Sequence, residues 1–198
     1  IVALTLALLM LLVMLCGCAQ QAPAQDTAQA DASTTVGSKL VGNPDDEYYM
    51  VTFQSGIEFW QQCRVGFEDA AALYGVKAIY AGSEQRDVEA CVSVLEQVIA
   101  KHPKGIAVTC VNADAYVDVL NRAVEEGIAV VTFNADCPNS NRYSYVGPDN
   151  YSGGQTAAKA IAEELNHTGK VAVIGVIGQS NHEDRASGFI DYINENEP

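Results

Sequence analysis

The chain has 198 residues, enough for one large domain or two small ones. Hydrophobic residues make up 48% of it and charged residues 18%, so most of the chain can form a packed core. The formal net charge is −14, from 25 acidic and 11 basic residues, and such a surface repels phosphate backbones. Composition therefore predicts a globular protein and argues against nucleic acid as a partner.

An uncharged apolar segment, residues 1–15, opens the chain. It is shorter than the roughly 20 residues of a membrane span but has the length of a signal-peptide core. The small residue Gly17 precedes Cys18, and this junction resembles the bacterial lipobox, whose last cysteine is acylated. We expect residues 1–18 to be a lipoprotein signal peptide that lacks its own start, with Cys18 as the lipidation site. The alternative is an uncleaved anchor or a plain signal peptide.

A polar segment, residues 19–46, follows the apolar one. Gln, Ala, Thr, Asp and Ser dominate most of it, and so few large apolar side chains cannot offset the chain entropy lost on folding. We expect a flexible tether that holds the following domain off a membrane. The two segments together predict a lipid-anchored protein of the cell envelope, outside the cytoplasmic membrane, in the periplasm or on the cell surface.

The rest of the chain alternates between strand and helix patterns. Runs of β-branched and aromatic residues, typical of buried parallel strands, lie at 48–53, 76–81, 105–110, 128–133 and 171–177. Apolar residues at helical spacing fill the first three intervals, and a glycine or proline follows each of these helices. This order predicts an α/β fold: a doubly wound parallel sheet in residues 47–147 and the start of a second, similar lobe in residues 148–198.

The loops after the strands of such a sheet lie at one edge, where open α/β folds bind ligands. None of these loops contains the phosphate-binding patterns GxxxxGK[ST] or GxGxxG. Residues 178–182 lack the second glycine of a nucleophile elbow, and His102, His167 and His182 are scattered along the chain. We therefore expect a protein that is not an enzyme and that has no cofactor and no metal site.

Four cysteines lie in the predicted globular part. Cys63, Cys91 and Cys110 occupy positions that we expect to be buried, where cysteine packs as a small apolar residue. Cys137 lies in a predicted loop. An exported protein can hold a disulfide, but the sequence gives no pairing, and core packing is the simpler interpretation for three of the four.

Candidate ligand-binding side chains lie in the same loops. Phe59 and Trp60 follow the first strand and can offer a flat apolar face to a sugar ring, or can fix the first helix to the core. Asn134 and Asp136 follow the fourth strand and can accept hydrogen bonds from hydroxyls, or can form a turn. Arg185, at the start of the last predicted helix, can donate a fork of hydrogen bonds or pair with a neighbouring carboxylate. This set favours a neutral polar ligand.

Several of these residues carry a resemblance that covers residues 48–197. The chain resembles the periplasmic sugar-binding proteins of the ribose-binding type, the type I receptor components of ATP-binding-cassette importers. The carriers are Phe59-Trp60, Gly66, Ala70-Ala71, residues 127–136, Arg142, residues 145–150, Gly154, Arg185 and Gly188-Phe189. The resemblance implies the periplasmic-binding-protein-like I fold. By position it implies a site of Phe59, Trp60, Asn134 and Arg185, with Asp136 as a further candidate.

The function that this resemblance implies is the capture of a small polar molecule, a monosaccharide above all, by hinge closure between two lobes. The closed form would deliver it to a membrane permease. The alternatives are a ligand-sensing receptor for a signalling partner and a sugar-responsive transcription regulator, although a regulator needs a DNA-binding segment where this chain has its apolar and polar segments. The family hinge runs near Gly147, and the family continues beyond the second helix of its second lobe, so we expect a chain truncated at its carboxyl end. Ile57-Glu58 in place of the family's Asn-Pro, and Asn134 in place of an acidic residue, leave the sugar open.

Overall fold

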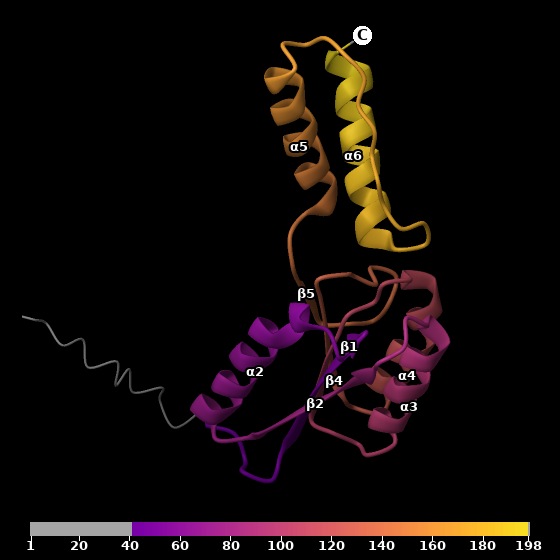
Figure 1. Cartoon of the computed structure of the whole chain (residues 1–198). Helices are drawn as coiled ribbons and strands as arrows, with labels where there is room; N and C mark the ends of the chain where they lie inside the picture. The colour runs from indigo at the N-terminus through magenta and orange to yellow at the C-terminus, as the bar shows by residue number, and fades with distance from the viewer. Residues whose placement is uncertain (1–40, 198) are drawn as a thin grey trace, which may run out of the picture. The chain divides into compact units, whose positions relative to one another are not determined.

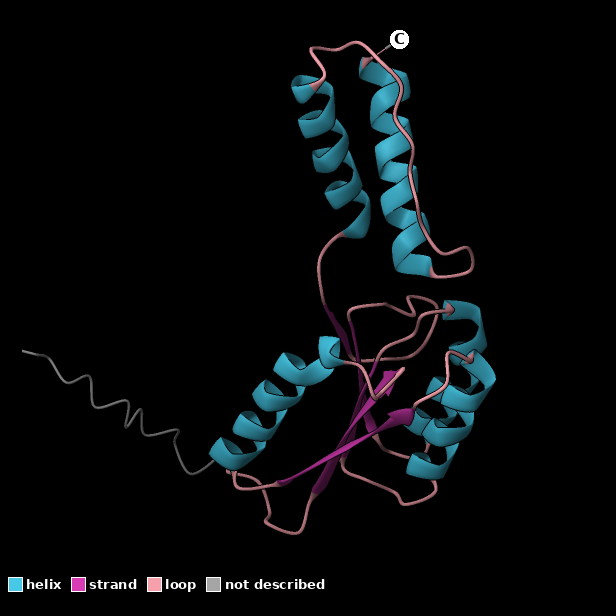
Figure 2. Ribbon diagram, viewed as in Figure 1, coloured by secondary structure: helices cyan, strands magenta, loops and turns pink. Residues whose placement is uncertain are grey.

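A computed structural model describes residues 41–197 of the chain. They form a five-stranded sheet with helices on both faces, followed along the chain by two long helices (Figures 1 and 2). The predicted signal peptide, its lipidation site Cys18 and most of the predicted tether lie outside the described residues. Within the described part, no helix is long and apolar enough to cross a membrane.

Over residues 47–133, from the first strand to the fourth, strands and helices alternate as the sequence predicts. The strands are β1 (Glu47–Phe53), β2 (Lys77–Ser83), β3 (Gly105–Val108), β4 (Ala129–Phe133) and β5 (Ser144–Val146). The helices are the short η1 (Glu58–Trp60), α2 (Gln61–Tyr74), α3 (Val88–Ile99), α4 (Ala113–Glu125), α5 (Asn150–Glu164) and α6 (Ser180–Asn196). All neighbouring strands are parallel, in the order β2-β1-β3-β4-β5. The predicted doubly wound α/β fold is confirmed.

The core lies between the sheet and the helices α3 and α4, which lie on one side of it while α2 lies on the other (Figure 1). Fully buried side chains from both layers meet there: Val51, Leu95, Val108, Leu120 and Val130. The amino ends of both helices are capped. The side chains of Asp87 and Asn112 accept hydrogen bonds from backbone N–H groups in the first turns of α3 and α4. These caps begin the helices directly after the loops that follow β2 and β3.

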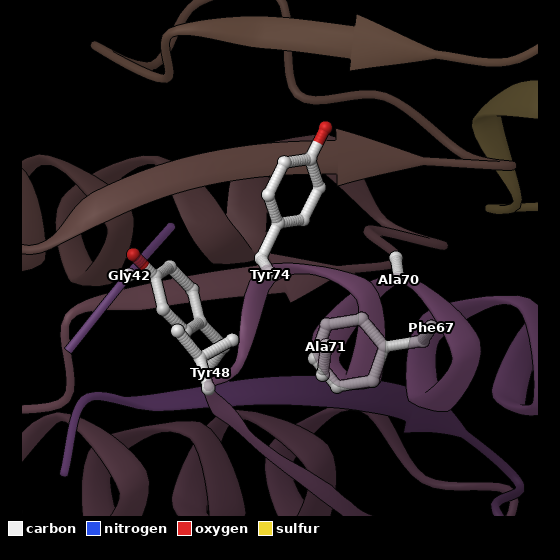
Figure 3. Close-up of a pocket in the computed structure, with 7 residues that line it drawn as sticks. Gly42, Tyr48, Phe67, Ala70, Ala71 and Tyr74 are labelled. Atoms are coloured by element: carbon white, nitrogen blue, oxygen red, sulfur yellow. The ribbon is translucent and has the colours of Figure 1, made fainter. Parts of the chain in front are cut away.

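Helix α2 is less deeply packed and buries only Ala71. An apolar cavity of about 280 Å³ lies beside it, and Figure 3 shows the aromatic side chains of Tyr48, Phe67 and Tyr74 that help to line it. Tyr48 lies near the start of β1, so this cavity is at the amino ends of the strands, away from the ligand-binding edge of α/β sheets. Cys63 in α2 is exposed, contrary to the prediction, because α2 packs on β1 and on the edge strand β2 through only part of its surface.

The predicted strand over residues 171–177 is wrong. These residues form no strand, and the side chains of Ile174 and Ile177 are 98% and 95% exposed. A strand is stabilised by hydrogen bonds to a neighbouring strand. Among residues 41–197 all strands belong to the single sheet that ends at β5, and none of them pairs with this segment. The local pattern is typical of a strand, but the partner is missing from the described part.

Helices α5 and α6 pack side by side (Figure 2). The contact depends on two glycines, because a Cβ atom on Gly154 would overlap the carbonyl oxygen of Arg185, and one on Gly188 would overlap that of Tyr151. Helix α6 begins at Ser180, earlier than the start predicted at Arg185. The predicted boundary between two lobes, after residue 147, falls in the loop between β5 and α5.

Candidate ligand-binding site

A cavity of about 310 Å³ lies at the carboxyl edge of the sheet. The loops after β1, β2, β3 and β4 contribute to its lining, together with the first turns of α6. Its polar lining residues are Gln54, Arg86, Asn134, Gln179, Asn181, His182 and Arg185, and its aromatic ones are Phe53, Phe59 and Trp60. The volume is at the lower end of the range of roughly 300 to 1,000 Å³ that is usual for small-molecule sites. The cavity therefore suits a small ligand with both polar and apolar surfaces.

Four of the five predicted binding residues line this cavity: Phe59, Trp60, Asn134 and Arg185. The parallel topology brings them together, because the ends of β1 and β4 meet at the same edge of the sheet. Arg185 reaches this edge from α6, whose first residue is held there by a hydrogen bond from the Ser180 backbone N–H to the carbonyl of Val111 (3.1 Å). Asp136 is not among the lining residues. Contact of any of them with a ligand stays a prediction.

The two adjacent aromatic residues have different environments. Trp60 is 4% exposed, and its Nε1–H donates a hydrogen bond of 2.7 Å to the carbonyl of Phe53. Phe59 is 63% exposed, with its ring edge-on to that of Trp60 at a centroid distance of 4.7 Å. Both lie in the 3₁₀ helix η1, where neighbouring residues point about 120° apart, so only one of the pair enters the core. Trp60 is therefore fixed in place, and Phe59 offers the free aromatic face.

Two strand ends turn sharply at the cavity. Gln54 directly follows β1 and Asn134 directly follows β4, and their φ angles of 51° and 62° lie in the left-handed region. Residues other than glycine adopt this conformation at a cost of about 1 to 3 kcal/mol and do so most often at functional sites. The backbone N–H of Asn134 donates to Val146 (3.1 Å), and its carbonyl accepts from the Tyr145 hydroxyl (3.1 Å). These bonds fix the turn that places the Asn134 side chain in the lining.

Arg185 is oriented by its neighbours through one nitrogen. Its Nε–H donates to the Asn150 side-chain oxygen and to the Asn181 carbonyl, both at 3.0 Å. Neither of its Nη groups has a hydrogen-bond partner among residues 41–197, and within that range the guanidinium does not form the alternative ion pair with a neighbouring carboxylate. Four N–H donors thus remain for a ligand.

Asp136 is engaged inside its own loop. Its carboxylate accepts hydrogen bonds from Arg142 Nε (2.5 Å) and Nη2 (2.6 Å), from the Thr132 hydroxyl (2.5 Å) and from the Cys137 backbone N–H (2.7 Å). Burial raises the pKa of Asp136, but the hydrogen bonds from Arg142, Thr132 and Cys137 outweigh it and leave the pKa below its ordinary value. The carboxylate is therefore ionised at neutral pH and stabilises the turn, which is the second of the two roles considered for it.

Three further lining residues were not singled out from the sequence. Arg86 follows β2, in a loop that the topology assigns to the binding edge, but nothing in its local sequence distinguishes it from a surface arginine. His182 accepts a hydrogen bond from the Val176 N–H at Nδ1 (3.1 Å), so its ring proton is on Nε2. Asn181 is 7% exposed, and its backbone carbonyl accepts the hydrogen bond from Arg185 Nε that helps to orient the guanidinium. The charged lining residues Arg86 and Arg185 are both donors, so a ligand must offer oxygen acceptors.

The comparison with known proteins covers this whole site. A family model of the periplasmic binding protein domain matches residues 48–198, which include every residue of the cavity lining. The chain belongs to this family. Periplasmic binding proteins capture ligands and are not enzymes, in agreement with the expectation from the sequence. The predicted resemblance to this class is thereby confirmed.

Individual periplasmic binding proteins give a closer comparison. The ribose import binding protein RbsB of Bacillus subtilis (strain 168) is 30% identical over 132 residues, which are 66% of this chain and 43% of that protein. The structure of AraP, an arabinose-binding protein from Geobacillus stearothermophilus, is 48% identical with a TM-score of 0.68, over 78% of this chain and 53% of that chain. A structure of the XylFII–LytSN complex is 28% identical with a TM-score of 0.74, over 77% and 56%. The chain thus spans about half the length of these relatives, or less.

Proposed function

We propose that the protein captures a monosaccharide in the cavity at the carboxyl edge of the sheet and delivers it to the permease of an ATP-binding-cassette importer. The observation that carries this proposal is the convergence of an exposed aromatic ring, Phe59, with the polar side chains of Asn134 and Arg185 on one cavity. The names of the relatives, which are ribose- and arabinose-binding proteins, support the choice of sugar as the ligand class.

Each side chain has a role that its chemistry supports. The free face of Phe59 would pack on the C–H face of the sugar ring, while Trp60 backs it from the core. The free Nη groups of Arg185 would donate to the ring oxygen and a hydroxyl. Asn134 both donates and accepts, which matches a hydroxyl group that does the same. The His182 Nε2–H would supply one more donor.

Closure would follow from binding. Residues 47–147 would form the first lobe and residues 148–198 the opening of the second, joined through Gly147. A ligand that contacts Asn134 from one side and Arg185 from the other favours the state in which both are close, and that closed state would be the form the permease receives.

We further propose that Cys18 carries the lipid and that residues 19–46 form the tether. Two experiments would test the anchor. Processing of the precursor should be sensitive to globomycin, and labelled palmitate should be incorporated into the wild type but not into Cys18→Ser. Labelling that persists in Cys18→Ser would contradict the proposal.

A second candidate is a ligand-sensing receptor for a signalling partner. The XylFII–LytSN complex shows a relative assembled with another protein, which supports this alternative. Uptake of labelled sugar by cells separates the two. If deletion of the gene abolishes uptake, the role in an importer is supported. If uptake is unchanged while a cellular response to the sugar is lost, the role as a sensing receptor is supported.

The binding experiment is thermal unfolding of the full-length protein, prepared without its lipid anchor, against pentoses and hexoses. A sugar at 100 times its dissociation constant should stabilise the protein by about 2.7 kcal/mol, a rise of several degrees in Tm. Phe59→Ala and Arg185→Ala should each remove the shift. Arg64→Gln, which lies outside the cavity lining and alters an exposed ion pair with Glu68 and a contact over the Tyr80 ring, should retain it. No shift with any monosaccharide, or a shift that survives both site variants, would overturn the proposal.

A further inference from the structure

The cavity at the carboxyl edge of the sheet has a charge of opposite sign to that of the protein. Among residues 41–197, Arg86 and Arg185 are the only lining residues with a permanent charge, and no carboxylate from this range lines the cavity. The whole chain, in contrast, carries a formal net charge of −14. A concave surface lined by one sign of charge focuses its potential, so this cavity attracts an anion while most of the surface repels one.

The charges of the two arginines are not neutralised within residues 41–197. Arg185 donates through Nε to two uncharged groups, the Asn150 side-chain oxygen and the Asn181 carbonyl. Arg86 is exposed in the loop after β2. The ion pairs of the described residues are formed by other cations. Both guanidinium groups can therefore bind an oxyanion through paired N–H donors.

The carboxylates close to these arginines along the chain, and that of the loop after β4, have other partners or lie outside the lining. Asp87 accepts a hydrogen bond of 2.9 Å from the first turn of α3. Glu183 accepts one of 2.8 Å from a backbone N–H of the preceding loop. Asp136 binds the arginine of its own turn, and Glu84 and Asp184 are not lining residues. A bound anion would supply the negative charge that the described part of the lining lacks.

Other groups of the lining suit hydroxyls and an apolar ring face. Asn181 is 7% exposed, and its side-chain oxygen is buried without a hydrogen-bond partner among residues 41–197. A buried acceptor without a donor is unfavourable, so a ligand hydroxyl that donates to it would be bound preferentially. The exposed ring of Phe59 offers the apolar face. An inorganic anion would not need the ring of Phe59, whereas a sugar that carries an oxyanion would use the ring, the amide and the arginines.

We propose that the ligand is an anionic monosaccharide, whose oxyanion is recognised by Arg86 and Arg185. This inference rests on the proposed function and names the class of sugar. The set of residues that predicted a neutral ligand contained Asp136 and omitted Arg86, but in the structure Arg86 lines the cavity and Asp136 does not. A carboxylate and a phosphate present the same chemistry to a guanidinium, namely two oxygens that accept parallel hydrogen bonds.

The test is calorimetric titration of the full-length protein, prepared without its lipid anchor, with matched pairs of sugars. The members of a pair share a ring and differ in one oxyanion: galactose and galacturonate, glucose and glucuronate, glucose and glucose 6-phosphate. We expect the charged member of at least one pair to bind about tenfold more tightly than its neutral partner, because hydrogen bonds to charged groups are the stronger ones. The uronate pairs and the phosphate pair tell the two kinds of oxyanion apart.

The salt dependence of the same titration is a second readout on the wild-type protein. An increase of ionic strength from about 0.05 M to about 0.5 M shortens the distance over which charges interact. The Kd of the charged sugar should therefore rise, while the Kd of its neutral partner stays the same. A charged sugar whose Kd is independent of salt would contradict recognition by the arginines.

Three variants test the residues. Arg86→Gln removes one charge from the lining and should lower the ratio of charged-sugar to neutral-sugar affinity about tenfold. The matched control Arg122→Gln makes the same change in net charge, but Arg122 pairs with Glu96 outside the lining, so the ratio should be retained. Asn134→Asp adds a negative charge to the lining and should lower the ratio. The Tm of each variant without ligand shows whether it folds.

The outcomes separate this inference from the proposed function. A neutral pentose or hexose that binds more tightly than every charged sugar would overturn the inference and leave the proposed function standing. An affinity ratio that is unchanged in a folded Arg86→Gln protein would overturn the assignment of the oxyanion to the arginines. Failure of every monosaccharide, charged or neutral, to bind would overturn both proposals.

Discussion

Replacement of Asp136 by asparagine tests whether this residue stabilises the loop after β4. The substitution keeps the shape of the side chain and the oxygen that accepts from Thr132 and the Cys137 backbone N–H. It removes the negative charge that receives both hydrogen bonds from Arg142. Apart from the charge, the change is therefore nearly isosteric.

The size of the effect follows from burial and geometry. The side chains of Asp136 and Arg142 are 24% and 19% exposed, and their two parallel hydrogen bonds are charge-assisted. A bond to a charged group contributes about 1.5 to 3 kcal/mol, and the guanidinium left behind would face an amide donor in place of a carboxylate. We expect Asp136→Asn to lower the free energy of unfolding by about 2 kcal/mol at pH 7. The matched control Glu68→Gln breaks an exposed i,i+4 pair with Arg64 and should lower the free energy of unfolding far less, because solvent screens exposed charges.

Urea unfolding followed by circular dichroism, from pH 7 down to pH 3, measures the difference. The folded-state pKa of Asp136 is lowered, so its contribution is fully present above the unfolded-state pKa and is lost as pH falls through the folded value. Wild type and variant should therefore differ most at pH 7 and converge below about pH 4. A gap that stays constant to pH 3, or that is no larger than that of Glu68→Gln, would refute the role assigned to this carboxylate.

Three other substitutions test packing and capping, each by urea unfolding followed by circular dichroism. Trp60→Phe removes the N–H that satisfies the buried Phe53 carbonyl and should cost about 1 to 3 kcal/mol; a loss under 0.5 kcal/mol would show that this bond contributes little. Gly188→Ala should disrupt the contact of α5 with α6 and lower the free energy of unfolding. Gly153→Ala, with open space around it, should leave the free energy of unfolding unchanged or raise it by up to about 1 kcal/mol. Equal effects of the two substitutions would contradict the close approach of the helices at Gly188. Asp87→Ala removes the cap of α3 and should cost about 1 kcal/mol, while no loss would mean that water replaces it.

The sequence predicted the first four strands because each is a short run of β-branched or aromatic residues that the fold buries. The same pattern failed at residues 171–177, since a local pattern does not contain the neighbouring strand that a ladder requires. Strand β5 was not predicted, because three residues carry too short a pattern.

For the site, the rule that the loops after parallel strands meet at one edge of the sheet was enough to predict that four residues lie together. The structure places these residues in the lining of one cavity: Phe59, Trp60, Asn134 and Arg185. The rule could not show that Asp136 lies outside the lining. The carboxylate of Asp136 binds Arg142 across a turn, and the path of that turn cannot be predicted from the sequence. The burial of Cys137 was missed for the same reason.

The left-handed backbone at Asn134 limits how the binding edge can change during evolution. Glycine, asparagine and aspartate adopt this conformation more readily than most residues, and a β-branched side chain there would be strained. Few side chains therefore suit position 134. The two polar ones, asparagine and aspartate, have nearly the same shape and differ in charge. Under the proposed function, a change of ligand preference at this position would be an exchange of amide for carboxylate, made without moving the backbone.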